Sequence, residues 1–296
     1  MALTLAEAAK LSNDVLLMGV IETIIYDSPV LQVLPFIEIV GNGLTYNQEN
    51  QAPTVAFYDV GDTWAESTPT FTQQTATLKI LGGDADVDNF LAKTRSNIQD
   101  LEAAVVQLKA KAVQQKFDDT FINGDTSSDA KSFNGIDKLC VSGQTLSMGA
   151  DGGTLTLEKL DELVDRIKGG KPDMLLMSKR SRRKLTALSR GSGSGIMEFD
   201  RNQFGQMVQY YSGIPLGIND WIPDNKTVGV STDCSTIYAL RFGEGSVAGL
   251  TAPGGLQVEK VGSLETKDAT RTRVKWYVAL ALFNTLKLTR LTGVRN

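Results

Sequence analysis

The chain of 296 residues contains no histidine. This absence removes the commonest general base, the usual zinc ligand and every serine or cysteine nucleophile that relies on a histidine partner. The best remaining enzymatic constellation is Asp161, Glu162 and Asp165 with serine or lysine nearby, but these carboxylates fall on the polar face of a predicted amphipathic helix. Because such faces are normally solvated, the pattern favours a protein that is not an enzyme and has no catalytic residue.

Cysteine and long apolar runs are also scarce. Cys140 and Cys234 are far apart and lack CxxC or zinc-ligand spacing, so they predict neither a disulfide framework nor a zinc site. A reducing cytoplasm is the simplest compartment. No stretch approaches about eighteen uninterrupted apolar residues, and no basic segment precedes an apolar core at the start of the chain. We therefore expect neither a membrane span nor an export signal.

Positive charge is not in excess, since the formal net charge is -4. This balance argues against a protein that wraps nucleic acid over its whole surface, and any such contact is expected to be local. The glycine runs GADGG and GSGSG lack the Gly-Lys-Ser/Thr ending of a P-loop and do not match a dinucleotide fingerprint. The sequence therefore predicts no nucleotide and no other cofactor.

Residues 44–81 have few core-forming side chains and are rich in threonine and glutamine. Pro53, Gly61 and Pro69 interrupt them, and the segment is too long for an ordinary loop. It predicts a two-stranded hairpin that projects from the body. An isolated hairpin is marginal in water, so its aromatic residues are expected to contact another subunit, although a hairpin folded back on its own domain stays possible. These aromatic residues are Phe57, Tyr58, Trp64 and Phe71.

Helices and strands are indicated elsewhere by the spacing of apolar residues. The longest predicted helix covers residues 96–119, with a capping box at Ser96 and Gln99 and an apolar stripe through Val105, Leu108 and Ala112. The other expected elements are two short helices within 3–25, a strand at 36–40, a mixed α/β layer over 155–250, a surface loop at 190–206 and a closing hairpin of long strands over 256–291.

An acidic cluster at the end of the long predicted helix reads FDDTFINGD, and SFNGI follows shortly after it. If Asp119 began an EF-hand loop, Asn123 and Gly124 would fall at suitable positions. However, Phe121 would occupy the third ligand position and Ala130 the position of the bidentate glutamate. The cluster therefore favours a helix end that runs into a turn-rich loop over a metal site.

These two phrases, in this order of elements, resemble the major capsid protein of tailed bacteriophages, which has the Hong Kong 97-type fold. The resemblance covers essentially the whole chain and implies an α+β fold. It implies an N-terminal arm (1–33), the first part of a peripheral domain (34–154) with an extended loop (44–81) and a spine helix (96–119), an axial domain (155–250), and closing peripheral strands (251–296).

The resemblance also implies a function and its partners. A structural protein of this kind self-assembles as pentamers and hexamers into an icosahedral shell around double-stranded DNA, inside the host bacterial cytoplasm, and ends in the virion capsid. Separate scaffold and portal proteins, and in some shells cement proteins, are the further partners. Some members cross-link through a lysine on the extended loop, but residues 45–76 contain no lysine, so that bond is not expected here.

A basic run after the predicted strand at 173–178 is the sharpest charge signal. Its members are Lys179, Arg180, Arg182, Arg183 and Lys184. At helical spacing they would form a positive face, which could meet packaged DNA, pair with an acidic neighbour around the axial ring, or simply be solvated. A bacterial encapsulin, which encloses cargo enzymes within the same fold, is the alternative to a phage capsid, because architecture alone does not identify the contents.

Overall fold

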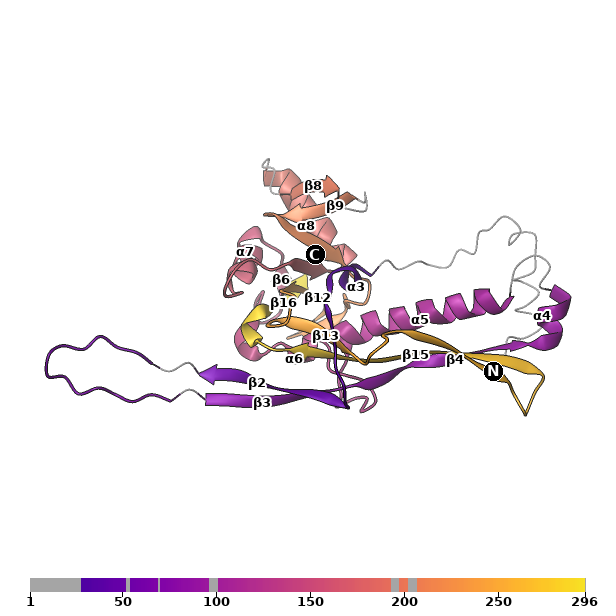
Figure 1. Ribbon diagram of the computed structural model, residues 1–296. Coiled ribbons are helices and arrows are strands. Elements are labelled where there is room, and N and C mark those ends of the chain that lie inside the picture. Colours follow the sequence, from indigo (N-terminus) through magenta and orange to yellow (C-terminus); the bar gives the residue numbers. More distant parts are fainter. Residues whose placement is uncertain are drawn as a thin grey trace.

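The computed structural model describes residues 28–51, 54–68, 70–95, 101–192, 197–201 and 207–295. Two helices predicted within residues 3–25 and the capping box at Ser96 and Gln99 lie outside these ranges. The described chain forms two β-sheets, a long helix between them and a hairpin that extends from one end (Figure 1). None of its helices is long and apolar enough to cross a membrane.

A five-stranded sheet forms the long base of the molecule. It contains β1 (Phe36–Glu38), β4 (Lys79–Asp88), β13 (Val247–Thr251), β14 (Gln257–Ser263) and β15 (Ala269–Leu282). The C-terminal part of β15 pairs antiparallel with β13, and its N-terminal part pairs with β14 and β4. The predicted hairpin of long strands is thus present as β14 and β15. The apolar end of β15 is buried on both faces, since residues 279–282 are all buried.

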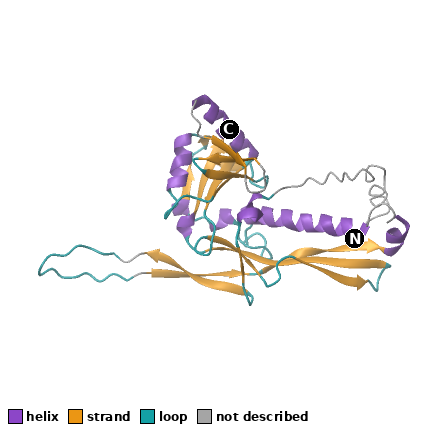
Figure 2. Ribbon diagram, turned by 45° about the horizontal axis from the view of Figure 1, so that its top comes forward, coloured by secondary structure: helices purple, strands orange, loops and turns teal. Residues whose placement is uncertain are grey.

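The long helix α5 (Leu101–Asn123) lies along this sheet, after a short helix α4 (Asn89–Arg95), as Figure 2 shows. α5 ends four residues beyond the predicted end at Asp119. Its core-facing stripe also differs from the predicted one: Val106, Ala110, Val113 and Phe117 contact the core, whereas Ala112 is exposed. The helix is apolar on more than one side, so the sequence pattern alone was compatible with two different core-facing stripes.

The second sheet has nine strands in the order β5-β16-β12-β7-β10-β9-β8, with β11 paired to β12 and β6 to β16. Its strands are β5 (Thr145–Ser147), β6 (Gly153–Thr154), β7 (Met174–Met177), β8 (Met197–Arg201), β9 (Met207–Tyr211), β10 (Ile214–Ile218), β11 (Lys226–Val228), β12 (Ser231–Leu240) and β16 (Leu288–Arg295). Helices α7 (Leu157–Asp165) and α8 (Lys179–Ser192) accompany this sheet, which confirms the predicted mixed α/β layer.

Three expectations about these segments need correction. Residues 197–201 are a strand that pairs with β9 and not part of a surface loop. β13 was placed in the axial segment 155–250 but pairs with β15 in the five-stranded sheet. The last strand, β16, pairs with β12, β5 and β6, so residues 288–295 complete the nine-stranded sheet and not the five-stranded one.

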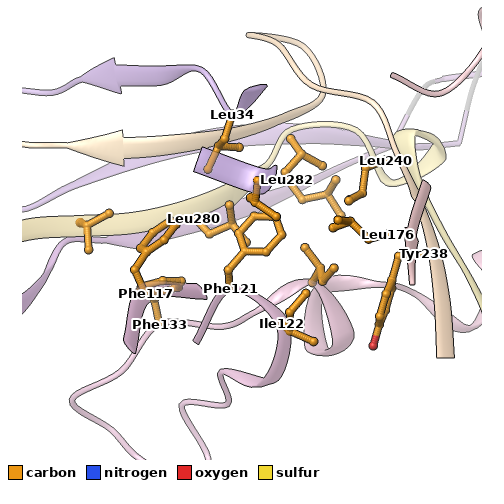
Figure 3. Packing of buried hydrophobic residues seen from close by; sticks show 14 of the residues in the cluster. Leu34, Phe117, Phe121, Ile122, Phe133, Leu176, Tyr238, Leu240, Leu280 and Leu282 are labelled. Atoms are coloured by element: carbon orange, nitrogen blue, oxygen red, sulfur yellow. The ribbon is translucent and has the colours of Figure 1, made fainter. Parts of the chain in front are cut away.

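A single hydrophobic core joins the two sheets (Figure 3). Leu176, Tyr238 and Leu240 come from the nine-stranded sheet, and Leu280 and Leu282 come from β15. The end of α5 and the segment after it fill the space between them with a group of aromatic and aliphatic side chains: Phe117, Phe121, Ile122, Phe133 and Ile136. A second core lies between the nine-stranded sheet and helices α7 and α8.

The short elements complete the chain. They are the helix α3 (Pro29–Val33), the helix α6 (Ile136–Leu139) and the 3-10 helices η1 (Ser142–Gln144) and η2 (Thr285–Lys287). Ser28 caps α3, because its side chain accepts a hydrogen bond from the backbone N–H of Leu31 and Pro29 occupies the first helical position.

Candidate assembly surfaces

The hairpin predicted for residues 44–81 is formed by β2 (Gly43–Gln51) and β3 (Thr70–Thr77), while β4 begins at Lys79. Its base packs against the end of β15: the rings of Tyr46 and Phe283 are tilted by 58° with centroids 4.8 Å apart, and Gln48 Nε2 donates to the carbonyl of Leu282 at 2.5 Å. Leu44 and Ala76 join the same small cluster. The hairpin is therefore anchored at its base, and its described far end projects away from the body (Figure 1).

The far end of the hairpin carries the aromatic residues singled out in the sequence. Phe57 is fully exposed, and Trp64 and Phe71 are 77% and 64% exposed. Tyr58 differs, because its ring stacks on Trp64 at a centroid distance of 4.4 Å and its hydroxyl accepts the backbone N–H of Ala65. The contact between Tyr58 and Trp64 thus stabilises the tip. The side chain of Phe57 exposes apolar surface to water, which is unfavourable.

The end of α5 explains the two glycine-containing phrases. Gly135 donates its backbone N–H to the carbonyl of Gly124 at 2.8 Å, so the two chain segments cross in backbone contact. A Cβ on Gly124 would lie 2.3 Å from the carbonyl oxygen of Phe133, and one on Gly135 would lie 2.6 Å from that of Thr120. Only glycine fits at this crossing. Asn134 completes it by accepting from both the backbone N–H and the hydroxyl of Thr126.

The acidic cluster at this helix end is a structural feature of the exit. Asp119 accepts hydrogen bonds from Lys116 and Asn123. Asn123 also donates to the carbonyl of Trp221 at 2.8 Å, and this bond connects α5 to the segment that follows β10 of the nine-stranded sheet. Phe121 is fully buried within α5 and faces the core. No group of three or more metal-ligating side chains occurs among the described residues. The contacts of Asp119 and Asn123 therefore place the acidic cluster at the end of α5.

Asp118 is a buried carboxylate on this helix, with an exposed fraction of 2%. Burial raises its pKa to about 6, and the hydroxyl of Ser28, which donates to Oδ1 at 2.6 Å, only partly opposes that shift. Ser28 is also the cap of α3. This one hydrogen bond therefore links the first described residue of the chain to the long helix.

Asp137 forms a second polar junction, between α6 and the nine-stranded sheet. Its carboxylate accepts from the hydroxyl of Tyr238 at 2.7 Å, from Lys226 at 2.8 Å and from Arg290 at 3.1 Å. Burial raises the pKa of Asp137, but the hydrogen bonds from Lys226 and Tyr238 outweigh it and hold the pKa below its usual value. Three strands are thereby joined to the segment that follows the glycine crossing.

The basic run lies on α8, as the sequence predicted. Lys179 pairs with Asp220 at 2.7 Å, and Arg180 lies 3.6 Å from Asp224 and donates to the carbonyl of Asp233. These acidic groups belong to the same chain. Within the described ranges, no ion pair is formed by the other three members of the run: Arg182, Arg183 and Lys184.

The carboxylates considered for an enzymatic reaction lie on α7. Asp161 accepts from the hydroxyl of Tyr211 at 2.6 Å, and Glu162 pairs with Lys159 at 2.6 Å in the same helix. Burial and the nearby Asp161 both raise the pKa of Tyr211. Asp161, Glu162 and Asp165 are all exposed on one helix, which agrees with a solvated polar face.

A ladder of ion pairs across β4 and β15 was missed in the sequence. Arg271 lies directly opposite Asp86 and Arg273 opposite Asp84, with Nε to carboxylate distances of 2.6 and 2.7 Å, and Lys267 adds a third contact to Asp86 at 2.7 Å. The hydrogen bond from Arg271 holds the pKa of Asp86 far below its usual value. The signal was present, because acids two residues apart and arginines two residues apart share one face of each strand.

Comparison with known protein families gives one match. The family model described as SU10 major capsid protein matches residues 60–294. A comparison with curated proteins found no match.

Several solved structures share this fold. The chain is similar to the holo-SrpI encapsulin complex from Synechococcus elongatus PCC 7942 (TM-score 0.73, 19% identity, 99% of this chain and 96% of that chain covered). It is also similar to the capsid of cyanophage A-1(L) (TM-score 0.68, 11% identity, 94% and 95% covered). A structure from Microbacterium phage Oxtober96 aligns with a TM-score of 0.65 at 15% identity, with 100% of both chains covered. At these identities the likeness shows the fold alone.

Proposed function

This chain belongs to the SU10 major capsid protein family, and from that membership we propose that it assembles as pentamers and hexamers into an icosahedral shell around double-stranded DNA. A major capsid protein of a phage-type shell is a structural protein and not an enzyme. The observation that carries the proposal is the extent of the family match, which spans residues 60–294 of a chain of 296.

In this proposal the five-stranded sheet with α5 is the peripheral domain and α5 is its spine helix. The nine-stranded sheet with α7 and α8 is the axial domain, which lines the centre of each ring. The proposed domain boundaries follow the sheets, because a strand belongs to the domain whose sheet it completes. β13 therefore moves to the peripheral domain and β16 to the axial domain. Residues 145–154 and 288–295 are therefore assigned to the axial domain.

The hairpin and its aromatic residues are proposed to contact a neighbouring subunit. Support comes from Phe57, Trp64 and Phe71, which are exposed on a hairpin that projects from the described body (Figure 2). Many such contacts, each weak, sum to a stable container, because every subunit supplies the same arm and the same acceptor surface.

Mass photometry of the purified chain tests the shell proposal directly. A subunit has a mass of 32.0 kDa, whereas a shell has a mass of megadaltons. We expect discrete megadalton particles, with nuclease-protected double-stranded DNA inside those made in cells that supply scaffold and portal proteins. A chain that remains monomeric at every concentration, with and without a scaffold, would refute it.

A second candidate is an encapsulin-like compartment that holds cargo proteins. The likeness to the holo-SrpI encapsulin complex at a TM-score of 0.73 favours it. The contents distinguish the two: particles that form without any phage partner and retain a defined protein in place of DNA would support the encapsulin-like function.

A further inference from the structure

The projecting hairpin is acidic and contains no positive charge. Between Thr45 and Leu78 the sequence has four acidic residues, Glu49, Asp59, Asp62 and Glu66, and neither lysine nor arginine. The combined charge of these four carboxylates equals the formal net charge of the whole chain, which is -4. The rest of the chain is therefore neutral overall, whereas the charged residues of the hairpin are all acidic.

The carboxylates near the tip remain available to a partner. Asp62 Oδ2 accepts the backbone N–H of Asp59, and Asp59 Oδ1 accepts that of Val60, so each closes the turn with one oxygen. Glu66 is exposed, and its side chain makes no hydrogen bond or ion pair with a described residue. A surface that covers this tip must supply cations, because a desolvated carboxylate without a partner is costly.

A group of four cations lies where α7 ends, at the edge of the nine-stranded sheet. We name it the α7-end cluster; its members are Lys168, Lys171, Arg241 and Lys287. Lys287 Nζ donates to the carbonyl of Lys168, Arg241 donates to that of Gly169, and Lys171 Nζ donates to that of Ser212. Among the described residues none of the four forms an ion pair, so the cluster keeps its positive charge.

The cluster is dense because two glycines leave room for it. Lys287 Nζ lies 2.7 Å and Arg241 Nη1 lies 4.0 Å from the position a Cβ would occupy on Gly169. Arg241 Nη1 lies 2.8 Å from the corresponding position on Gly170. Both glycines have positive φ angles, 78° and 126°. Neutral backbone carbonyls therefore hold two cationic groups close together over an open loop.

Two other basic surfaces of the described residues have acids of the same chain beside them, although Arg182, Arg183 and Lys184 of α8 form no ion pair there. Lys179 and Arg180 of α8 have carboxylates of the same chain beside them, and the arginines of β15 are paired across to β4. The acid nearest in sequence to the α7-end cluster is Asp173, whose carboxylate accepts the backbone N–H of Phe242 and forms no ion pair with a described residue. The α7-end cluster is thus a positive surface with which no carboxylate of the described residues forms an ion pair.

We propose that the acidic tip of the hairpin on one copy of this chain docks on the α7-end cluster of a second copy. The inference rests on the proposed shell function and adds the receiving surface and the chemistry of recognition. Attraction between the acidic tip and the basic cluster guides the two copies together and determines how they align. The exposed Phe57 and Trp64 then add apolar contact when water is displaced.

The length of the hairpin allows its tip to reach another molecule. About twelve residues separate Gln48, the last anchored residue on β2, from Val60 at the tip, and an extended chain rises about 3.3 Å per residue. The tip is therefore carried up to about 40 Å beyond its anchor. A contact of this kind joins two different surfaces of identical chains, which produces a closed ring when the rotation between them closes.

A charge swap tests this proposal. Glu66→Lys and Lys168→Glu alter charge at exposed side chains that make no hydrogen bond with a described residue, so both variants should fold. Each reversal replaces an attraction by a repulsion, and we expect it to raise the concentration needed for assembly about tenfold at low salt. The combined variant should return to within about threefold of the original chain. Lys131→Glu, at an exposed lysine on a distant loop, is the matched control and should change nothing.

The outcomes separate this inference from the shell proposal. A zero-length carbodiimide cross-link between Glu66 and Lys168 of different subunits, in rings or shells, would support the contact directly. Shells that form normally with either reversal would overturn the docking alone. Lys168→Glu particles that form normally but lose DNA would overturn it too and assign the cluster to phosphate binding. A chain that is monomeric under all conditions would overturn both proposals.

Discussion

Gly124 and Gly135 are the residues on which the end of the long helix depends. Replacing either by alanine places a methyl group against backbone carbonyls at 2.3 to 2.6 Å. We expect each change to lower the free energy of unfolding by about 3 kcal/mol, because backbone atoms cannot move aside as a flexible side chain can. Urea unfolding of the subunit measures this loss.

Gly143→Ala is the control for that experiment, because no atom lies within 4 Å of the added methyl group. It should change the free energy of unfolding by less than about 0.5 kcal/mol. Gly124→Ala or Gly135→Ala subunits as stable as the control would contradict the crossing described here.

Asp118 gives the subunit a pH dependence of known sign. Its pKa is raised to about 6, so the folded state binds a proton more tightly than the unfolded state, and stability rises as pH falls from 7 towards 4. The full shift corresponds to about 3 kcal/mol. Asp118→Asn should remove this slope. Thermal unfolding of both proteins between pH 4.5 and 7 measures it, and parallel curves would show that Asp118 does not titrate in that range.

That window isolates Asp118 from the other carboxylates. Arg271 and Arg273 beside Asp86 and Asp84 lower the pKa of those groups, so the stability they add is fully present above their unfolded pKa of about 4. It is lost only as pH falls below that value. The two effects therefore have opposite signs and occupy different pH ranges.

At the residue scale the sequence predicted the character of individual side chains better than their partners. The glycines of FINGD and FNGI stood out, but nothing in the sequence says that Gly124 and Gly135 meet each other. Likewise, the basic run on α8 was visible, whereas Asp220 and Asp224, which partly neutralise it, lie some forty residues away along the chain. Pairing across such separations depends on the fold.

At the element scale, helices and strands with one apolar face were predictable and those without one were not. α7 and β7 follow their patterns closely. α5 is apolar on several sides, so its packed stripe depends on where Phe117 and Phe121 enter the core between the two sheets. Phe117 packs there on Phe36 and Trp276 of the five-stranded sheet. The strand at 197–201 alternates charged residues with Met197 and Phe199, and its glycine-rich neighbours hid that signal.

The hairpin is the element whose function is most open to test. Replacing Phe57 and Trp64 by serine removes apolar surface from its tip but touches no core, so the subunit should keep its melting temperature. Shells should dissociate more readily, at a temperature lower by several degrees, because each lost contact recurs in every subunit. Light scattering during heating measures the dissociation.

Val230→Ser is the matched control for the hairpin, since Val230 is 85% exposed and lies away from the tip. It removes a comparable apolar side chain and should leave shells unchanged. If the doubly substituted hairpin gave shells of undiminished heat resistance, the role of its aromatic residues in subunit contact would be wrong.

At the scale of the whole molecule, the order of elements was predicted and the exchange of strands between sheets was not. β16 was expected to follow β15 in one sheet, because neighbouring strands usually pair. Instead η2 carries the chain across to β12, where Leu288, Leu291 and Val294 find buried positions. The sheet that β16 joins depends on which sheet can bury its apolar side chains, and the local sequence does not contain that information.

The exchange of strands has a measurable consequence, because both sheets bury side chains in one core. Leu176 and Leu240 from one sheet contact the cluster that holds Val274 and Leu280 from the other. The subunit should therefore unfold in a single calorimetric transition, although its sheets were assigned to two domains. Leu240→Ala leaves a cavity in this shared core and should cost about 2–5 kcal/mol while keeping one transition. In this variant the backbone amides of both sheets should lose protection against hydrogen exchange together. Two separate calorimetric transitions would mean that the sheets fold independently and that the shared core does not couple them.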